Sequence, residues 1–364
     1  MIPPEDIEKL IRPELKAMNA YTPIEPTDIL SQRIKLPQEK VIKLDGNENP
    51  HGCSAKVKQA LAKHAHYHLY PDPEQRELRK ALVEYTGISP EYILAGSGSD
   101  ELIDLVLRLF IEPGDKVIDC PPTFGMYPFS TGVCGGRLVS IPRKPDFSID
   151  VTAVKEALDK QTKVIFIASP NNPSGNITPK DTILELLDSY MVVVIDEAYF
   201  EFSGVTVMPL VSKYSNLIVL RTFSKWAGLA GLRVGYGIFP INIAKYLMKI
   251  KQPYNVNTAA QVAALESLRD MSYLRDTIKA IIDERQRLLS KLGQLDWLKV
   301  YPSQANFILC SVLNGKAKAI HEELQNRGIF VRYFDTPQLK DCLRISVGKP
   351  EHTDALIVAL KEIC

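Results

Sequence analysis

The feature of the sequence that most constrains its fold is a series of short apolar runs separated by helix-like segments, beginning at Ile93. Continuous apolar strands are typical of a parallel sheet covered on both faces, whereas half-exposed strands alternate between apolar and polar residues. The predicted strands are 92–95, 116–120, 137–141, 164–168, 192–195, 217–220 and 234–239. Apolar spacing predicts helices after the first strand, with Ser99 or Asp100 as N-cap, and at 151–159 and 179–190. We therefore expect an α/β fold with a mostly parallel sheet flanked by helices.

The length of the chain and a change of pattern after Pro253 indicate a second domain. A chain of 364 residues exceeds the size at which one hydrophobic core stops growing. A long helical stretch near 258–295 is followed by shorter strands and helices, which is typical of a small α+β domain. The expected organisation is an N-terminal arm contributing to the small domain (1–40), a large domain (41–257), a connecting helical region (258–295) and a small C-terminal domain (296–364). Within the arm we expect a short helix over 5–20 and an extended, proline-containing segment over 21–26.

Composition excludes several classes of function. The formal net charge of +1 leaves no broad basic field, so nucleic acid is not expected as a partner. Six scattered cysteines without a CxxC pair indicate reduced thiols, and no apolar run approaches the roughly 20 residues of a membrane span. The N-terminus lacks the basic and apolar segments of a signal peptide, so we expect a soluble, cytoplasmic protein. His64, His66 and His68 could form a metal site, but no acidic or cysteine ligand is near them in the sequence. We therefore favour a solvated segment that leads into the turn at 70–73, and we expect no metal.

Polar clusters follow several of the predicted strands, at the edge where parallel sheets bind ligands. The loop 96–100 precedes a helix and offers backbone N–H groups to an anion. The loop 169–175 holds two asparagines between prolines. Asp196 follows four apolar residues, and a buried carboxylate requires a partner such as a metal or a cationic ring nitrogen. Tyr199, three residues later, suits a phenolic ligand atom. Each cluster alone also fits a structural role, but their common placement fits far fewer interpretations.

Lys225 is the most informative of these residues. It follows Thr222 and Ser224 and precedes Arg233, so a single amine lies among two hydroxyls and a guanidinium. Lysine forms Schiff bases once burial or a cationic neighbour lowers its pKa. The hydroxyls and the arginine are suitable phosphate ligands. The combination suggests an enzyme that uses pyridoxal phosphate.

A set of motifs extends this interpretation over nearly the whole chain. They are 44–50, 70–72, 120–127, 169–175, 196–199, 222–235, 305–309 and 343–348. With these motifs the sequence resembles the fold-type-I pyridoxal-phosphate-dependent aminotransferases, and within that family it is most similar to the histidinol-phosphate aminotransferases. The resemblance implies transamination between L-histidinol phosphate and 2-oxoglutarate in histidine biosynthesis, by a homodimer.

The resemblance also implies roles for individual residues. Lys225 would form the Schiff base and move a proton to and from the substrate, and Asp196 would pair with the ring nitrogen. Asn172 and Tyr199 would hydrogen-bond the phenolic oxygen of the ring, and Phe124 would stack on its face. The implied phosphate-binding residues are Gly98, Ser99, Asp100, Thr222, Ser224, Arg233 and, from the other subunit, Tyr70. The implied substrate-binding residues are Tyr21, Asn47, Asn172, Arg332 and Arg344, of which the two arginines would grip phosphate or carboxylates.

Four alternatives remain at this point. Two keep the fold and cofactor: an aromatic amino-acid aminotransferase and a threonine-phosphate decarboxylase. A third is a ligand sensor of the same fold without turnover, but the roughly 40 residues before the core are too few and too weakly basic for a DNA-binding module. The fourth is a dinucleotide-dependent dehydrogenase, which the lack of a GxGxxG motif after the first strand disfavours.

Overall fold

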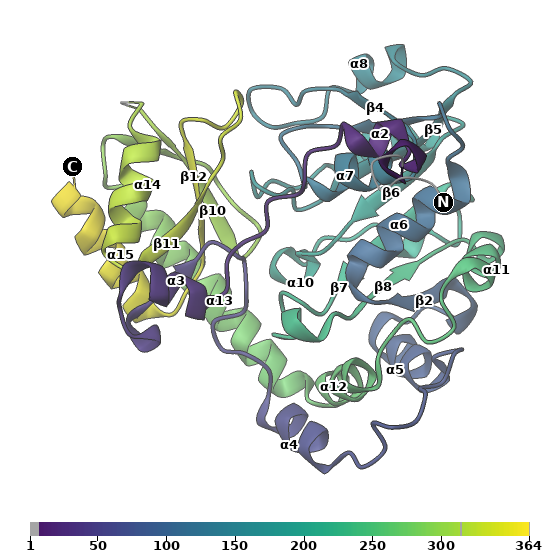
Figure 1. Ribbon diagram of the computed structural model, residues 1–364, viewed down its shortest axis with the longest axis horizontal. Helices are drawn as coiled ribbons and strands as arrows, with labels where there is room; N and C mark the ends of the chain where they lie inside the picture. Colours follow the sequence, from purple (N-terminus) through teal and green to yellow (C-terminus); the bar gives the residue numbers. More distant parts are fainter. Residues whose placement is uncertain (1–6, 314, 364) are drawn as a thin grey trace.

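The computed structural model describes residues 7–313 and 315–363, which form two sheets flanked by helices (Figure 1). The larger sheet has the strand order β2-β8-β7-β6-β5-β3-β4. Its strands are β2 (Ile93–Gly96), β3 (Lys116–Asp119), β4 (Arg137–Ser140), β5 (Thr162–Ala168), β6 (Val192–Asp196), β7 (Leu217–Thr222) and β8 (Gly235–Ile238). The predicted mostly parallel α/β sheet is thus confirmed.

One strand of this sheet runs against the others. β8 pairs antiparallel with both β7 and β2. A parallel neighbour needs a crossover, usually a helix, whereas β7 and β8 are joined by a loop with only the short 3₁₀ helix η5 (Ala230–Leu232). That loop carries Lys225.

Helices cover both faces of the larger sheet because its strands are apolar on both sides. Val164 and Phe166 of β5 belong to one buried cluster with residues of α6, while Ile165 and Ile167 belong to a second cluster with Ile183 of α9. The helices of this half are α4 (Ala55–Lys63), α5 (Arg76–Thr86), α6 (Gly98–Phe110), α7 (Met126–Val133), α8 (Val151–Glu156), α9 (Lys180–Leu187), α10 (Phe200–Ser203) and α11 (Ile241–Ile250). The spacing of apolar residues did not predict α4 or α5.

The smaller sheet has the order β1-β11-β12-β10-β9 and is mainly antiparallel. Its elements are β1 (Ile42–Leu44), β9 (Leu298–Val300), β10 (Phe307–Val312), β11 (Ile329–Tyr333) and β12 (Cys342–Ser346), with α14 (Ala317–Asn326) and α15 (Pro350–Ile363). We predicted that the large domain begins at residue 41, but β1 pairs in parallel with β11 and so forms the edge of the smaller sheet. The other domain boundaries remain predictions.

The connecting region consists of α12 (Thr258–Arg269) and α13 (Met271–Leu292), which meet at Asp270. In Figure 1, α13 runs from α12 toward the smaller sheet. No helix within the described residues is long and apolar enough to cross a membrane.

The N-terminal arm differs from its prediction. The expected helix over 5–20 is replaced by η1 (Glu8–Leu10) and α2 (Pro13–Lys16), because Pro13 lacks an N–H and starts a new helix; residues 5 and 6 lie outside the described part. The predicted extended segment does connect α2 to α3 (Thr27–Ile34). It crosses from the side of α7 to the smaller sheet (Figure 1).

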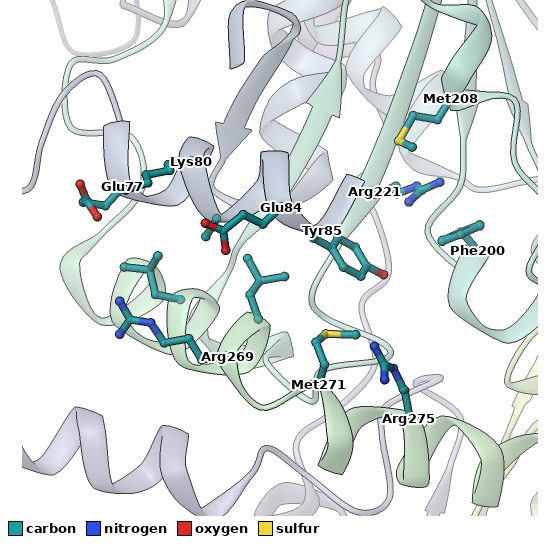
Figure 2. A pocket seen from close by; sticks show the side chains of 13 residues that line it. Glu77, Lys80, Glu84, Tyr85, Phe200, Met208, Arg221, Arg269, Met271 and Arg275 are labelled. Atoms are coloured by element: carbon teal, nitrogen blue, oxygen red, sulfur yellow. The ribbon is translucent and has the colours of Figure 1, made fainter. Parts of the chain in front are cut away.

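A buried ion pair joins two strands of the larger sheet. Arg221 of β7 donates to Glu197, after β6, at 2.8 Å, and the two side chains are 2% and 1% exposed. Arg221 also donates to the hydroxyl of Thr206 at 2.8 Å and lies 3.5 Å over the ring of Phe200. Figure 2 shows Arg221, Phe200 and Tyr85 beside a cavity of 640 Å³. None of the predicted site residues lines that cavity.

Replacing Arg221 by methionine should lower the free energy of unfolding by roughly 3–5 kcal/mol, because Glu197 would stay buried without a cation. Denaturant titration of the purified protein measures the loss. The matched control is Arg269→Met, which breaks an exposed ion pair with Glu266 and should cost less than about 1 kcal/mol. Equal losses in the two variants would contradict the importance of the buried pair.

Candidate active site

Most of the predicted cofactor residues surround one cavity of 240 Å³ at the carboxyl ends of β5, β6 and β7. These ends converge because the three strands are parallel neighbours. The predicted residues that line the cavity are Ser99, Asp100, Phe124, Asn172, Asp196, Tyr199, Thr222, Ser224, Lys225 and Arg233. The structure therefore brings these ten residues together around one cavity, and their roles toward the cofactor stay predictions.

A larger cleft of 600 Å³ shares Asn172 and Lys225 with the cavity. It adds residues of the arm, of the segment after β1 and of the smaller sheet. The predicted substrate residues in its lining are Tyr21, Asn47, Arg332 and Arg344. The cleft thus extends from the ends of the large sheet to the smaller one.

Lys225 faces this cleft with an unusually acidic ammonium group. Burial and, second in size, the nearby charge of Arg344 lower its pKa to about 8. Its Nζ donates to the carbonyl of Gly46 at 3.2 Å. The side chain is partly exposed and lines both the cavity and the cleft. A larger fraction of this lysine is neutral near neutral pH than of an ordinary lysine.

Asp196 is the buried carboxylate of the cavity, with 4% of its surface exposed. Its Oδ2 accepts a hydrogen bond from the Tyr127 hydroxyl at 2.8 Å, and its Oδ1 accepts one from the Ala198 N–H at 3.0 Å. Burial raises its pKa to about 6, while these two bonds act to lower it. No cation forms an ion pair with Asp196 in the part of the chain that the structure describes, so the carboxylate suits a positively charged ring nitrogen.

The opposite end of the cavity is shaped for an anion. The helix α6 begins at Gly98, whose φ is +77°, and a Cβ there would lie 2.6 Å from the Arg233 Nη2. The same guanidinium pairs with the Asp100 carboxylate at 2.7 Å. The hydroxyls of Thr222 and Ser224 are 2.9 Å apart. A helix N-terminus, an arginine and two hydroxyls fit the phosphate of pyridoxal phosphate, as Asp196 fits its ring nitrogen.

Tyr199 and Asn47 form a buried pair at the junction with the smaller sheet. The Asn47 Nδ2 donates to the Tyr199 hydroxyl at 3.0 Å, and its Oδ1 accepts from the Ser346 hydroxyl at 2.9 Å. Asn47 has a φ of +53°, which asparagine tolerates better than most residues. Because both ends of its amide are used within the protein, Asn47 positions Tyr199 as well as lining the cleft.

Two arginines of the smaller sheet lie on adjacent strands, with Arg332 of β11 directly opposite Arg344 of β12. Arg344 donates to the Asn172 Oδ1 at 2.6 Å and to the carbonyl of Asp45. Its Nε is buried without a partner, and burial lowers its pKa to about 10. Among the described residues no carboxylate pairs with Arg344. A buried guanidinium without a counter-ion is suited to an anionic ligand.

Tyr21 of the arm lies at the cleft, whereas Tyr70, the residue expected to act in the other subunit, does not. Tyr21 lines the cleft with its ring 6.4 Å from that of Phe129, and Arg332 donates to the Thr22 carbonyl at 3.2 Å, which ties the arm to the smaller sheet. Tyr70 lines neither the cavity nor the cleft: it is 81% exposed and stacks on Tyr254 at 4.3 Å. The site of its own chain does not include it.

The histidine cluster contains three neighbouring rings, with 6.0 Å between the centroids of His64 and His66 and 6.1 Å between those of His66 and His68. Within residues 7–313 and 315–363, no group of three or more His, Cys, Asp or Glu side chains could hold a metal ion.

Sequence reasoning missed Tyr127, which both lines the cavity and binds Asp196. A signal was present, because Tyr127 lies three residues after Phe124 within the motif 120–127. It also missed Phe334, whose ring lies 5.8 Å from the Arg332 guanidinium and 5.7 Å from that of Arg344.

Comparison with known proteins gives one consistent result. The profile of the family described as aminotransferase class I and II matches residues 39–360. The chain is 50% identical to a histidinol-phosphate aminotransferase of Dehalococcoides mccartyi over 98% of this chain and 99% of that protein. It is 49% identical to histidinol-phosphate aminotransferase 1, chloroplastic, of Arabidopsis thaliana, over 98% and 86% of the two chains. The crystal structure of histidinol-phosphate aminotransferase from Sinorhizobium meliloti in complex with pyridoxal-5'-phosphate matches with a TM-score of 0.88 at 28% identity, covering 97% of each chain.

Replacing Arg344 by glutamine should raise the pKa of Lys225, because a nearby positive charge would be lost. Acylation of Lys225 in the protein without cofactor, located by mass spectrometry across a pH series, measures this pKa. The rate profile of the variant should move to higher pH. Arg332→Gln serves as control, since Arg332 is not among the charges that lower the pKa of Lys225. An unchanged profile in Arg344→Gln would contradict the coupling.

Proposed function

This chain belongs to the family of class I and II aminotransferases, and from that premise we propose that it transfers the amino group of L-histidinol phosphate to 2-oxoglutarate. The products are imidazole-acetol phosphate and L-glutamate, in a step of histidine biosynthesis. The cofactor is pyridoxal phosphate. One observation carries the proposal: the cavity around Asp196 and Lys225 shares lining residues with a cleft that also contains Arg344, a guanidinium with no carboxylate partner among the described residues.

Lys225 acts as the proton carrier in this scheme. Pyridoxal phosphate, when bound, supplies an aldehyde that condenses with amino groups and a ring that accepts the electron pair of the broken Cα–H bond. The lowered pKa of Lys225 lets its amine take the proton from the α carbon of the substrate near neutral pH and deliver it to the C4′ carbon of the cofactor. The Gly46 carbonyl, 3.2 Å from its Nζ, keeps the amine directed into the shared space.

Three other side chains orient the cofactor. Asp196 keeps a proton on the ring nitrogen by offering a buried negative charge. The Tyr199 hydroxyl, positioned by Asn47, and the Asn172 amide serve the phenolic oxygen. The Nδ2 of Asn172 has no hydrogen-bond partner in the described part of the chain, and its Oδ1 is occupied by Arg344.

The arginine pair selects anionic substrates. Histidinol phosphate carries a phosphate and 2-oxoglutarate carries two carboxylates, and a guanidinium binds either group through paired hydrogen bonds. Arg332 and Arg344 lie side by side on β11 and β12, so one grip serves both halves of the reaction. The arm around Tyr21 covers the same cleft and helps to exclude water.

A homodimer with shared active sites is part of the proposal. Tyr67, Leu69, Tyr70 and Tyr254 are all exposed, and Tyr70 and Tyr254 stack on each other. Clustered exposed aromatic side chains are typical of a protein interface. In the proposed dimer Tyr70 reaches the phosphate site of the partner subunit. We also propose a cytoplasmic location, which the free thiols of Cys53, Cys120, Cys134, Cys310 and Cys342 support.

The purified enzyme should form a cofactor absorbance typical of an imine with pyridoxal phosphate, and Lys225→Ala should abolish it. The value of kcat/KM for histidinol phosphate should exceed that for phenylalanine by about 10- to 100-fold, the worth of one or two charge-assisted hydrogen bonds to the phosphate. Steady-state assays with 2-oxoglutarate as acceptor measure the ratio. A preference for phenylalanine would overturn the substrate assignment, and the absence of the absorbance in the wild type would overturn the reaction class.

Mixing subunits tests the shared site. Lys225→Ala and Tyr70→Ala homodimers should each be nearly inactive, whereas an equimolar mixture after subunit exchange should recover about a quarter of wild-type activity, because half of the dimers hold one intact site. Gel filtration confirms that the mixture is dimeric. No recovery, with exchange verified by differently tagged subunits, would rule out the contribution of Tyr70 across the interface.

A further inference from the structure

We propose that Tyr127 is a positioning residue for the reaction: its hydroxyl holds Asp196 in the ionised form and in the orientation that the cofactor's ring nitrogen requires. The inference rests on the proposed function, because it concerns the partner of that ring. Tyr127 belongs to the motif 120–127, in which the sequence alone assigned it no role of its own.

The surroundings of the Tyr127 side chain direct its hydroxyl at Asp196. The residue lies in the first turn of α7 and is fully buried. Its ring stacks on Phe166 at 4.9 Å with an interplanar angle of 9°, and meets the ring of Phe124 edge-on at 5.6 Å. These apolar contacts fix the position of the phenol on two sides. Within the described residues, the one partner of its hydroxyl is the Asp196 Oδ2 at 2.8 Å.

This contact joins two parts of the cofactor site. Phe124 and Asp196 both line the cavity, one as the proposed stacking ring and the other as the proposed ring-nitrogen partner. Tyr127 touches both. Together with the Ala198 N–H on Oδ1, the hydroxyl fixes the carboxylate plane from two sides. The oxygen lone pairs that these donors do not use remain available to the cavity that Asp196 lines.

The charges around Asp196 explain why a donor is needed there. Burial raises its pKa, and the neighbouring carboxylates Asp100 and Glu197 raise it as well. Against these effects stand the hydrogen bonds from Tyr127 and from the Ala198 N–H. Tyr199 and Arg143 are the other titratable groups nearby, and they act on the pKa of Tyr127 in opposite directions. Loss of the Tyr127 hydroxyl would therefore raise the pKa of Asp196 and increase the protonated fraction of the carboxyl group near neutral pH.

The chain contains a matched control for this contact. Tyr85 is half-buried, stacks on Trp226 at 5.4 Å with an angle of 9°, and donates to the Glu201 carboxylate at 3.2 Å. It lines the cavity of Figure 2 and not the cofactor site. Tyr85→Phe and Tyr127→Phe therefore each remove a hydroxyl that donates to a carboxylate from a stacked ring, but only Tyr127→Phe removes it beside the proposed cofactor site.

The test compares Tyr127→Phe, Tyr85→Phe and wild type in two forms. In the enzyme without cofactor, carbon NMR of labelled aspartate carboxyl groups reports the pKa of Asp196, with Asp196→Asn providing the assignment. In the enzyme loaded with pyridoxal phosphate, absorbance is titrated against pH and steady-state rates are measured. Tyr127→Phe should raise the pKa of Asp196, shift the absorbance titration and lower kcat by about tenfold with little change in KM. Tyr85→Phe should leave all four quantities near their wild-type values.

Each outcome decides the proposal. An unchanged Asp196 pKa and an unchanged absorbance titration in Tyr127→Phe would overturn it, as would equal effects of the two variants on kcat. If Tyr127→Phe fails to fold, 3-fluorotyrosine at position 127 keeps the size and strengthens the donor, so it should lower the pKa of Asp196; no change would overturn the proposal. If the wild-type protein binds no cofactor, the proposed function is wrong. The NMR measurement on the cofactor-free protein would still test the hydrogen bond.

Discussion

The site depends on keeping ionisable groups away from water without giving them permanent counter-ions. Burial is the main cause of the pKa shifts of Lys225, Asp196 and Arg344 alike. A charge held in this way is costly to the folded chain unless a ligand completes it. Pyridoxal phosphate and the anionic substrates supply the missing partners: a cationic nitrogen for Asp196 and negative oxygens for the guanidinium groups. The contrast is the Arg221–Glu197 pair, which is as deeply buried but fully compensated within the protein.

The larger sheet makes this arrangement possible because its backbone hydrogen bonds hold the strand ends in place. Asp196 ends β6 and Thr222 ends β7, and the pairing of those two strands fixes how far apart their last residues lie. The reversal of β8 then returns the chain beside β7, so that Lys225 and Arg233 come from one loop that is anchored at both ends. The smaller sheet contributes the arginines and, through β1, the segment that contacts Lys225 at Gly46.

The repeating pattern of strands and helices was predictable from the sequence, whereas features that depend on contacts between distant segments were not. Short apolar strands identified the large sheet, and strand ends together with the family resemblance named ten residues that line one cavity. Parallel strands direct their carboxyl ends to the same edge of the sheet, which is why residues such as Asp196 and Thr222 meet there. The direction of β8 was not evident, since an apolar run reads the same in either direction. The placement of β1 depends on the free edge of β11, almost 290 residues later in the chain. Tyr127 and Asn47 were hard to interpret for a related reason: their tasks lie in hydrogen bonds to Asp196 and Tyr199, which no local pattern encodes.

The opposed arginines of β11 and β12 carry a consequence for how such an enzyme can change over evolution. Like charges directly across a ladder destabilise the sheet that holds them, and the charge of Arg332 adds to the burial that lowers the pKa of Arg344. Substituting either one by an apolar residue would relieve that repulsion and strengthen the smaller sheet. Selection for heat resistance alone would therefore tend to erase the anion grip. Its persistence requires selection for binding, because this is a place where stability and activity are in direct competition.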